Sequence, residues 1–431
     1  MALFQKKKKT RSCAVGLDGV PYSLVLEMAD RGVMPAMADL LRNGRLQRMK
    51  ASLPEISAVS WTDFMTGTDS GGHGIFGFTD LKPGSYSLRF PNFLDVKRET
   101  LWDTLGKMEK RSIILNQPST YPARPLNGVL VSGFVALDLA KAVYPLSQKG
   151  TLDRLGYQVD IDSLKSRQDH AFFWSEIQKT TDGRERALDH FWKDDWDFFE
   201  FVITGTDRLH HFLWNAYADL NHPDHDRFLD YYRRVDAIIG RIVLSYRRLT
   251  GGLTGLYLLS DHGFCQIVQE VYLNAWLQKE GYLRFDGDAP QGLEAIGEES
   301  VAFALDPSRI YLNTRGRFPK GFVEESGRQA LKEEISRKLR GLEFQGRKVI
   351  RQVFDAAAVY TGPQSAAGPD LLVLSEPGFD LKGSVKKREV FGRTDLEGMH
   401  TWDDAFLWSE SKVADDLMIR HVSAAILGHY K

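Results

Sequence analysis

Two short runs far apart in the sequence each end an apolar, strand-like stretch in an aspartate and a histidine. The first, VITGTDRLHHF, carries Asp207 and His211, and the second, LYLLSDHGF, carries Asp261 and His262. Carboxylate and imidazole groups are ligands that divalent metal ions commonly take from proteins. With three further candidates, these residues indicate a two-metal hydrolase site: Asp18, Ser57 and His400.

The spacing within each run also bears on a metal site. Asp207 and His211 are four residues apart, so a helix that begins after the Thr-Gly pair at 204–205 places both side chains on one face. Asp261 and His262 directly follow a strand pattern. Because loops and ligands converge at the carboxyl edge of an open α/β sheet, we expect the two runs to meet there.

Each of these residues also has a simpler interpretation. A single Asp or His after a strand is more often a cap or a polar contact than a ligand, and this applies to Asp18 and to His400, one of 11 histidines. His73 belongs to a turn and is interpreted as structural. The metal site is favoured because four apolar strands each end in a ligand-type residue.

The segment PEISAVSWTDFMTGTDSGGHGIFGF contains the candidate nucleophile, Ser57, where a helix pattern begins. A hydroxyl at a helix N-terminus meets unpaired backbone N–H groups and the positive end of the dipole, which favour an alkoxide and a bound phosphate. A nearby dication would lower its pKa further. The alternative is a helix cap, the commonest role of Ser at such a position.

Composition excludes several classes of protein. The net charge of −1 provides no overall basic field of the kind that binds nucleic acids, so no nucleic-acid polymer is expected as a partner. The lysine run at 6–9 is interpreted as a solvated, poorly ordered tail. Two cysteines, Cys13 and Cys265, fit a reducing compartment, and no apolar run approaches the length of a membrane span. We therefore expect a cytoplasmic protein.

The elements that must position these residues alternate along the chain. Strands are predicted at 12–17, 44–54, 111–115, 128–133, 198–203, 255–259 and 370–374, and helices at 22–43, 58–65 and 222–249. This alternation is typical of a mostly parallel sheet covered by helices on both faces, a three-layer αβα sandwich.

Two segments interrupt this pattern. Residues 268–367 are less regular, with a helix pattern at 322–339, and are interpreted as an inserted cap or lid. The catalytic core would then comprise 11–267 and 368–431, with a second possible insertion at 137–186.

Several landmarks in combination resemble one known family. GLDG, the TG and HGIFGF run, GTDRLHH, SDHGF and GMH extend from residue 16 to 400. In this order they are similar to the alkaline phosphatase superfamily, and within it to the type I phosphodiesterases and nucleotide pyrophosphatases. The resemblance implies an alkaline phosphatase-like fold and hydrolysis of a small-molecule phosphate ester.

The resemblance also implies roles for individual residues. Asp18, Asp261 and His262 would hold one metal ion, and the second would be held by Asp207, His211 and His400. Ser57, ten residues before Gly67, stands where the family has its Thr or Ser nucleophile and would also contact a metal ion; Ser60 and Thr62 are weaker candidates.

The implied mechanism is in-line displacement at phosphorus between two metal ions, through a covalent phospho-serine. The ligand set suits Zn²⁺ first, and Mn²⁺ is also compatible. Substrate contacts are predicted for Phe78, Arg208 and His210, and Lys82 and Arg89 are further basic candidates. Phe78 occupies the position at which nucleotide pyrophosphatases of this group carry an Asn that contacts a phosphoryl oxygen.

Other functions fit the same scaffold. A phosphomonoesterase or a mutase-like phosphotransferase would use the same residues. A sulfatase is disfavoured because the residues after Ser57 do not form a formylglycine motif. A non-catalytic metal-binding scaffold remains a rival from another class, although the presence of all seven candidate positions argues against it.

Overall fold

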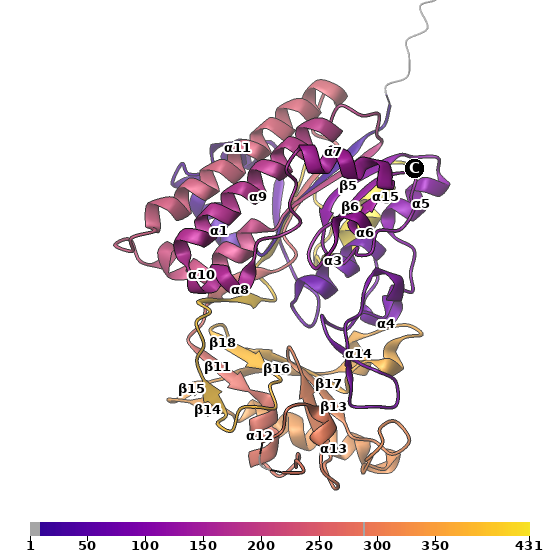
Figure 1. The fold of residues 1–431 in the computed structure, drawn as a ribbon, viewed down its shortest axis with the longest axis vertical. Helices are drawn as coiled ribbons and strands as arrows, with labels where there is room; N and C mark the ends of the chain where they lie inside the picture. The colour runs from indigo at the N-terminus through magenta and orange to yellow at the C-terminus, as the bar shows by residue number, and fades with distance from the viewer. Residues whose placement is uncertain (1–8, 288) are drawn as a thin grey trace, which may run out of the picture.

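The computed structural model describes residues 9–287 and 289–431, and its centre is an eight-stranded sheet in the order β2-β21-β9-β1-β8-β5-β6-β7 (Figure 1). Five neighbouring strands of this sheet run parallel: β1 (Ser12–Leu17), β5 (Ser112–Gln117), β6 (Gly128–Ser132), β8 (Phe198–Ile203) and β9 (Leu256–Leu259). Antiparallel pairings occur only toward its two edges, which are formed by β2 (Arg45–Met49), β21 (Ala405–Ser409) and β7 (Val143–Tyr144).

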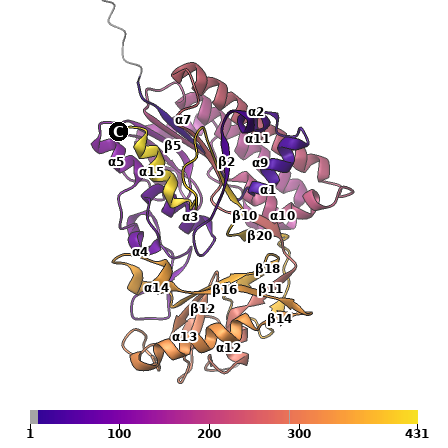
Figure 2. The ribbon, with the colours of Figure 1, turned by 180° about the vertical axis from the view of Figure 1, so that it is seen from behind.

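Helices cover both faces of this sheet. One face carries α1 (Tyr22–Asp30), α2 (Pro35–Asn43), α9 (His170–Phe191), α10 (Gly205–Ala218) and α11 (His225–Thr250). The opposite face, seen in Figure 2, carries α3 (Ser57–Thr66), α5 (Leu101–Lys107) and α15 (Arg420–Gly428). The predicted αβα sandwich is confirmed.

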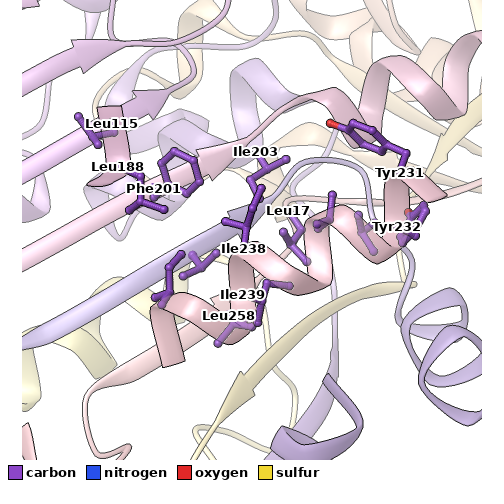
Figure 3. Close-up of a cluster of buried hydrophobic side chains, with 14 of the residues drawn as sticks. Leu17, Leu115, Leu188, Phe201, Ile203, Tyr231, Tyr232, Ile238, Ile239 and Leu258 are labelled. Atoms are coloured by element: carbon purple, nitrogen blue, oxygen red, sulfur yellow. The ribbon is translucent and has the colours of Figure 1, made fainter. Parts of the chain in front are cut away.

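Strand β8 shows why its sequence gives this arrangement. All six of its residues are buried, as expected for a strand covered on both faces. Phe199 and Phe201 pack toward α9 and α11, whereas Phe198 and Val202 pack toward α3 and α5. Figure 3 shows the first of these clusters, in which Phe201 lies beside Leu188 of α9 and Ile203 lies near Ile238 of α11.

A second unit lies beyond one end of the sheet (Figures 1 and 2). Its four-stranded sheet is β12-β13-β17-β16, and a three-stranded sheet, β18-β11-β19, lies beside it. The unit buries its own cluster of apolar side chains. Its elements are β11 (Gln269–Tyr272), α12 (Leu273–Lys279), β12 (Ala302–Leu305), β13 (Arg309–Leu312), α13 (Glu325–Arg340), β14 (Glu343–Phe344), β15 (Arg347–Lys348), β16 (Ile350–Asp355), α14 (Ala356–Val359), β17 (Leu371–Ser375), β18 (Phe379–Lys382) and β19 (Phe391–Gly392).

A hairpin from the N-terminal part of the chain inserts into this second unit. It consists of β3 (Asp80–Leu81) and β4 (Leu88–Arg89), and Tyr86 lies between the two strands in sequence. The Tyr86 ring packs among the apolar side chains of the second unit, 5.8 Å from the Phe303 ring, and its hydroxyl donates to Asn313 Oδ1 at 2.7 Å. The hairpin therefore provides a contact between the two units in addition to the chain segments that connect them.

Three predicted elements differ from the structure. The strand expected to reach residue 54 ends at Met49, as β2. The helix expected at 22–43 is divided into α1 and α2, because Gly32 adopts a left-handed φ of 72° and Pro35 begins a new helix. The strand expected at 370–374 forms, as β17, but pairs antiparallel in the sheet of the second unit. We therefore propose that the cap extends from 268 to 392 rather than ending at 367.

The segment proposed as a second insertion, 137–186, is mainly helical. It contains α6 (Leu139–Ala142), α7 (Lys149–Arg154), α8 (Ser163–Gln168) and most of α9. Of the lysine run, residues 6–8 lie outside the described part of the chain, and Lys9 pairs with Asp195 at 2.7 Å. Among the described residues, no helix combines the length and the apolar character needed to cross a membrane.

Candidate metal centre

The predicted metal ligands all lie at the carboxyl edge of the central sheet or in the loops beside it. Asp18 directly follows β1, and Asp207 and His211 lie in the first half of α10, which follows β8. Asp261 and His262 connect β9 to β10 (Gly263–Gln266). His400 lies on β20 (Gly398–Thr401), which pairs antiparallel with β10 and sets His400 opposite Phe264.

The first set of ligand atoms belongs to Asp18, Asp261 and His262, which lie within 4.8 Å of one another. His262 Nε2 is 3.7 Å from Asp18 Oδ1 and 3.3 Å from Asp261 Oδ2. The backbone N–H of Gly19 donates to Asp261 Oδ1 at 3.0 Å, so the loop after β1 orients this carboxylate. All three side chains are buried.

The second set lies beside the first. Asp207 Oδ1 is 3.5 Å from His211 Nε2 and 3.4 Å from His400 Nε2, and the two imidazole nitrogens are 3.0 Å apart. The i, i+4 spacing on α10 thus brings Asp207 and His211 to one face, as the sequence predicts. His262 Nε2 is also 4.0 Å from Asp207 Oδ1, so it lies between the two sets.

Backbone carbonyl groups orient the imidazole rings of His211 and His400. His211 Nδ1 lies 3.0 Å from the Gly398 carbonyl oxygen, and His400 Nδ1 lies 2.8 Å from the Glu55 carbonyl oxygen. An imidazole that donates from Nδ1 to a carbonyl presents the lone pair of Nε2 on its other side. This second-layer hydrogen bonding aims both Nε2 atoms at Asp207.

Two buried carboxylate oxygens are left for a cation. Asp207 Oδ1 and Asp261 Oδ2 have no hydrogen-bond partner among the described residues. An unpaired buried carboxylate oxygen is costly, and a metal ion is one of the few groups that compensate it. The residues present therefore fit a bound divalent ion at each of the two sets.

The electrostatics of the cluster agree with this fit. Burial, together with the neighbouring Asp261 and Asp207 charges, raises the pKa of Asp18 well above its usual range, and burial raises the pKa of Asp261 to about 6. Although burial opposes its ionisation, the charges of His211, His400 and Arg208 hold the pKa of Asp207 well below its usual range. Carboxylates crowded in this way repel one another until a cation lies between them.

Ser57 is the first residue of α3 and faces the first set. Its Oγ is 3.3 Å from Asp18 Oδ1 and 3.2 Å from His262 Nε2, and its side chain is buried. The Ser57 side chain makes no capping hydrogen bond to its own helix, because the N-cap position is Ile56. The other two hydroxyls are directed elsewhere: Ser60 Oγ accepts from Ser52 N, and Thr62 Oγ1 donates to the Ala58 carbonyl.

Arg208 borders the second set and is tightly held. Its guanidinium donates to Asp160 at 2.6 Å from Nη2 and 3.2 Å from Nε, and Nη1 lies 3.3 Å from Asp207 Oδ2. The guanidinium carbon lies over the Phe134 ring, 4.3 Å from its centroid. Asp160 comes from the helical segment 137–186, so this segment helps to position a charge at the site.

An apolar cavity of about 550 Å³ lies against α3, and its wall includes Ala58, the residue after Ser57. Ala58 and Thr62 of α3 form part of its wall, and Phe78 and Phe134, whose ring centroids are 5.5 Å apart, form another part. Its rim carries the exposed side chains of Phe90 and Leu137. Phe78, for which a substrate contact is predicted, thus lines this cavity.

His210 does not reach the cluster. Its side chain is fully buried, with Nδ1 2.9 Å from the Gly19 carbonyl and Nε2 2.7 Å from the Tyr232 hydroxyl. Both ring nitrogens are thus occupied within the protein, and we do not retain His210 among the substrate contacts. Lys82 and Arg89 belong to the hairpin around Tyr86, where Arg89 pairs with Asp80 and Asp95.

Sequence reasoning missed Glu55 and Asp160 as residues of the site. Glu55 lies two residues before Ser57, a position that a search for polar neighbours of the candidate nucleophile would have found. Asp160 lies in an irregular stretch between α7 and α8, 48 residues from Arg208, and no local pattern indicates that pairing.

Comparisons with known proteins agree with this geometry. The family model of type I phosphodiesterase / nucleotide pyrophosphatase matches residues 13–403. The search of curated proteins gave no sequence match. Among solved structures, phosphonoacetate hydrolase from Sinorhizobium meliloti 1021, in complex with phosphonoformate, superposes with a TM-score of 0.63 at 14% identity, covering 98% of this chain and 96% of that chain.

A second similar structure is murine ectonucleotide pyrophosphatase / phosphodiesterase 5, in an inactive variant with AMP. It gives a TM-score of 0.53 at 12% identity and covers 98% of this chain and 95% of that chain. These likenesses show a shared alkaline phosphatase-like fold. Because the family model covers most of the sequence, the chain belongs to the type I phosphodiesterase / nucleotide pyrophosphatase family, whose members are metal-dependent phosphoester hydrolases.

Proposed function

We propose that this protein hydrolyses phosphodiesters with Ser57 as the nucleophile and two divalent metal ions as cofactors. The observation that carries the proposal is the position of Ser57 Oγ, 3.3 Å from Asp18 Oδ1 and 3.2 Å from His262 Nε2, at the start of α3. Family membership supports hydrolysis of a phosphoester, and the geometry supports this particular hydroxyl.

The two sets of side chains would hold one ion each. Asp18, Asp261 and His262 would hold the first together with Ser57, and the second would be held by Asp207, His211 and His400. When bound, such ions withdraw charge from phosphoryl oxygens and lower the pKa of a hydroxyl or water. The nitrogen and oxygen donors suit Zn²⁺, which we propose as the native ion, with Mn²⁺ as the alternative.

The residues of the chain then supply orientation and charge. Ser57 Oγ attacks phosphorus, the bond to the leaving alcohol breaks, and a phosphodiester to Ser57 forms. The backbone N–H groups of Ser57 and Ala58 at the start of α3 and the guanidinium of Arg208 stabilise the negative charge on the non-bridging oxygens. Water then cleaves the bond between Ser57 and phosphorus, which releases a phosphomonoester and restores the hydroxyl.

The apolar cavity against α3 supports a diester rather than a monoester. An ester arm of aromatic or aliphatic character would pack against Phe78 and Phe134 in this cavity of about 550 Å³. Apolar surface removed from water contributes roughly 25 cal/mol per Å², so a bulky arm adds several kcal/mol of binding. With Phe78 in place of a polar residue, the cavity favours such organic arms over a polyanionic one.

The first test compares bis-p-nitrophenyl phosphate with p-nitrophenyl phosphate on metal-stripped protein to which Zn²⁺ or Mn²⁺ is added. We expect metal-dependent turnover that prefers the diester, and a loss of about 10³-fold or more in kcat for Ser57→Ala. The matched control is Ser60→Ala, three residues further along α3 and outside the site, which should retain activity.

Rapid quenching with intact-mass detection should show an aryl phosphoryl group on Ser57 during turnover. Preference for the monoester would reassign the protein to the phosphatases or phosphotransferases, and full activity in Ser57→Ala would rule out the nucleophile. Absence of turnover and of bound metal would favour a non-catalytic scaffold.

We also propose a reducing, cytoplasmic setting, supported by two free cysteines.

A further inference from the structure

Large apolar side chains that are open to solvent surround the mouth of the apolar cavity. Phe90, Val135 and Leu137 belong to its wall and are 75%, 43% and 89% exposed. Phe90 directly follows β4, whereas Val135 and Leu137 lie between β6 and α6, so two separate segments of the chain meet here. These three residues form what we term the apolar rim.

The exposure of the apolar rim sets it apart from the rest of the surface. Leu137 and Phe90 are among the three most exposed large apolar side chains of the described residues. A single exposed leucine is ordinary, but apolar side chains gathered around one opening mark an interaction surface. Because both side chains project into solvent, a rigid protein partner would need hollows that match them. A fluid partner closes around them without such a match.

Cations without ionic partners flank the apolar rim. Lys97 and Arg98 directly follow Val96 of the cavity wall, and Lys141 of α6 lies four residues after Leu137. All three basic side chains are exposed, and none of them makes a salt bridge within the described part of the chain. They are therefore free to meet negative charges on a partner.

Most carboxylates of the same two segments are already engaged. Asp95 pairs with Arg89 at 3.0 Å, and Glu99 pairs with Lys107. Asp138 has no cationic partner among the described residues, and its side chain caps the start of α6. Three unpaired cations thus stand against one unpaired carboxylate, so this face attracts an anionic partner.

The same charges argue against a second copy of the chain as that partner. A two-fold contact through the apolar rim would bring each patch against its own copy, with Lys97, Arg98 and Lys141 facing like charges. An anionic lipid bilayer satisfies both features of the face. Its interfacial region accepts apolar side chains, and its headgroups attract nearby lysines and arginines.

We propose that the apolar rim docks this protein on an anionic lipid bilayer. Phe90 and Leu137 enter the boundary between headgroups and acyl chains, and Lys97, Arg98 and Lys141 lie against the phosphate groups of the lipids. Few side chains take part, so the docking is reversible and strengthens with the negative charge of the surface. The proposal concerns a surface and does not depend on the chemistry proposed for Ser57.

The test sediments the full-length protein with lipid vesicles and measures the bound fraction. One set of vesicles is phosphatidylcholine alone, and the other contains about 30 mol% phosphatidylserine. We expect the partition coefficient to be at least about 10-fold higher for the vesicles with phosphatidylserine, because several cations face the surface. Added salt should lower this preference, because it screens the attraction.

A double variant tests the apolar side chains. Phe90→Ser combined with Leu137→Ser should lower the partition coefficient for the mixed vesicles by about 10-fold or more, because two large side chains no longer leave water. The matched control is Leu220→Ser, 70% exposed in the turn between α10 and α11 and outside the cavity wall. The control should bind as the wild type does, and thermal midpoints should stay unchanged in both variants.

Single variants test the cations. Lys97→Gln and Lys141→Gln should each lower binding to the mixed vesicles by about 5-fold, and should leave binding to phosphatidylcholine unchanged. The matched control is Lys279→Gln in α12, an exposed lysine of the cap that makes no salt bridge among the described residues. It should retain the wild-type preference.

Three results would overturn the proposal: no binding to either kind of vesicle by folded protein, equal binding to both lipid mixtures, or equal binding of the Phe90→Ser/Leu137→Ser variant and the wild type. A dimer that forms in the wild type and is lost in this variant, without vesicle binding, would assign the apolar rim to a contact between copies instead. Because no turnover is measured, none of these results bears on the nucleophile.

Discussion

At the scale of single residues, the candidate metal centre contains buried carboxylate oxygens that have no hydrogen-bond partner among the described residues. Asp207 Oδ1 lies within 3.5 Å of two imidazole nitrogens and makes no hydrogen bond within the described chain. Replacing it by Asn removes the charge that a cation requires at the second set. We therefore expect Asp207→Asn to bind about one metal ion per chain in place of two, and to lose at least about 100-fold in kcat/KM.

Elemental analysis of the purified protein checks this expectation. The control is Asp395→Asn, an exposed carboxylate paired with Arg167, which should retain two ions. Two ions in Asp207→Asn would show that this residue is not a ligand.

Glu200 gives a prediction about pH. It lies in β8, 1% exposed, with neither carboxylate oxygen hydrogen-bonded among the described residues, and burial raises its pKa from 4.5 to about 8. The folded state thus binds this proton more tightly than the unfolded state does. Its contribution to stability is full below pH 4.5 and is lost as the pH rises toward 8, a change of a few kcal/mol.

The variant Glu200→Gln has the same shape and no titrating group. Thermal midpoints of both proteins are measured at pH 6 and pH 8.5, with metal present. The midpoint of the variant relative to that of the wild type should be several degrees higher at pH 8.5 than at pH 6. Midpoints that move in parallel would show that Glu200 keeps its ordinary pKa.

Much of the site at this scale follows from the sequence, and the reason is local. Asp207 and His211 share a helix turn, and Asp18, Asp261 and His262 directly follow strands, so short-range geometry was sufficient to bring them to one edge. His210 was not predictable in this way, because its burial depends on Tyr232 of α11 and on the Gly19 carbonyl. The Asp160 partner of Arg208 likewise depends on tertiary packing.

At the scale of elements, the position of Ser57 depends on how closely α3 approaches β1. A Cβ at Gly16 would lie 2.5 Å from the Trp61 ring, so only glycine allows this helix to pack on the strand. We expect Gly16→Ala to lower the free energy of unfolding by about 1–3 kcal/mol through overpacking. Urea unfolding of the two proteins measures this loss.

The matched control is Gly150→Ala in α7, where a Cβ would meet nothing within 4 Å. Alanine in a helix is favoured over glycine, so this variant should gain roughly 0.5–1 kcal/mol. Equal stability of the Gly16→Ala variant and the wild type would show that α3 can move away at no cost.

The five parallel strands of the central sheet were predictable because their apolar runs are nearly continuous, whereas β7, β21 and most strands of the cap were not. The match between 198–203 and β8 is complete, since every residue of this strand except Glu200 is apolar, as expected for a strand buried on both faces. In contrast, β14, β15 and β19 are two residues long and carry no pattern of their own. The sheet to which β17 belongs could not be predicted from the sequence either, because an apolar strand does not specify which strands it pairs with.

At the scale of the whole molecule, the metal centre joins segments from residue 18 to residue 400. Without a cation, the buried carboxylates of Asp18, Asp207 and Asp261 repel one another at the edge of the sheet. Ions that bind only the folded chain stabilise it by about 2.7 kcal/mol at 100 times the dissociation constant. We therefore expect chelation to lower the thermal midpoint by at least about 5 °C.

Adding Zn²⁺ or Mn²⁺ back in separate samples should restore the thermal midpoint. The ion that raises the midpoint further at equal concentration is the one that the site binds more tightly. A midpoint that does not respond to chelator, in protein shown to hold metal beforehand, would place the ions outside this centre. The Asp207→Asn variant should respond less than the wild type, because it holds one ion fewer.

The hairpin that carries Tyr86 has a consequence for chimaeric proteins. The side chain belongs by sequence to the N-terminal part of the chain, yet it fills the apolar interior of the cap and bonds to Asn313. If the cap were replaced by that of a relative through exchange of one continuous segment, the new cap would lack its own side chain at the position that the Tyr86 ring fills. Recombination that respects the interior must therefore cut the gene in two places, so that residues 80–89 travel together with residues 268–392.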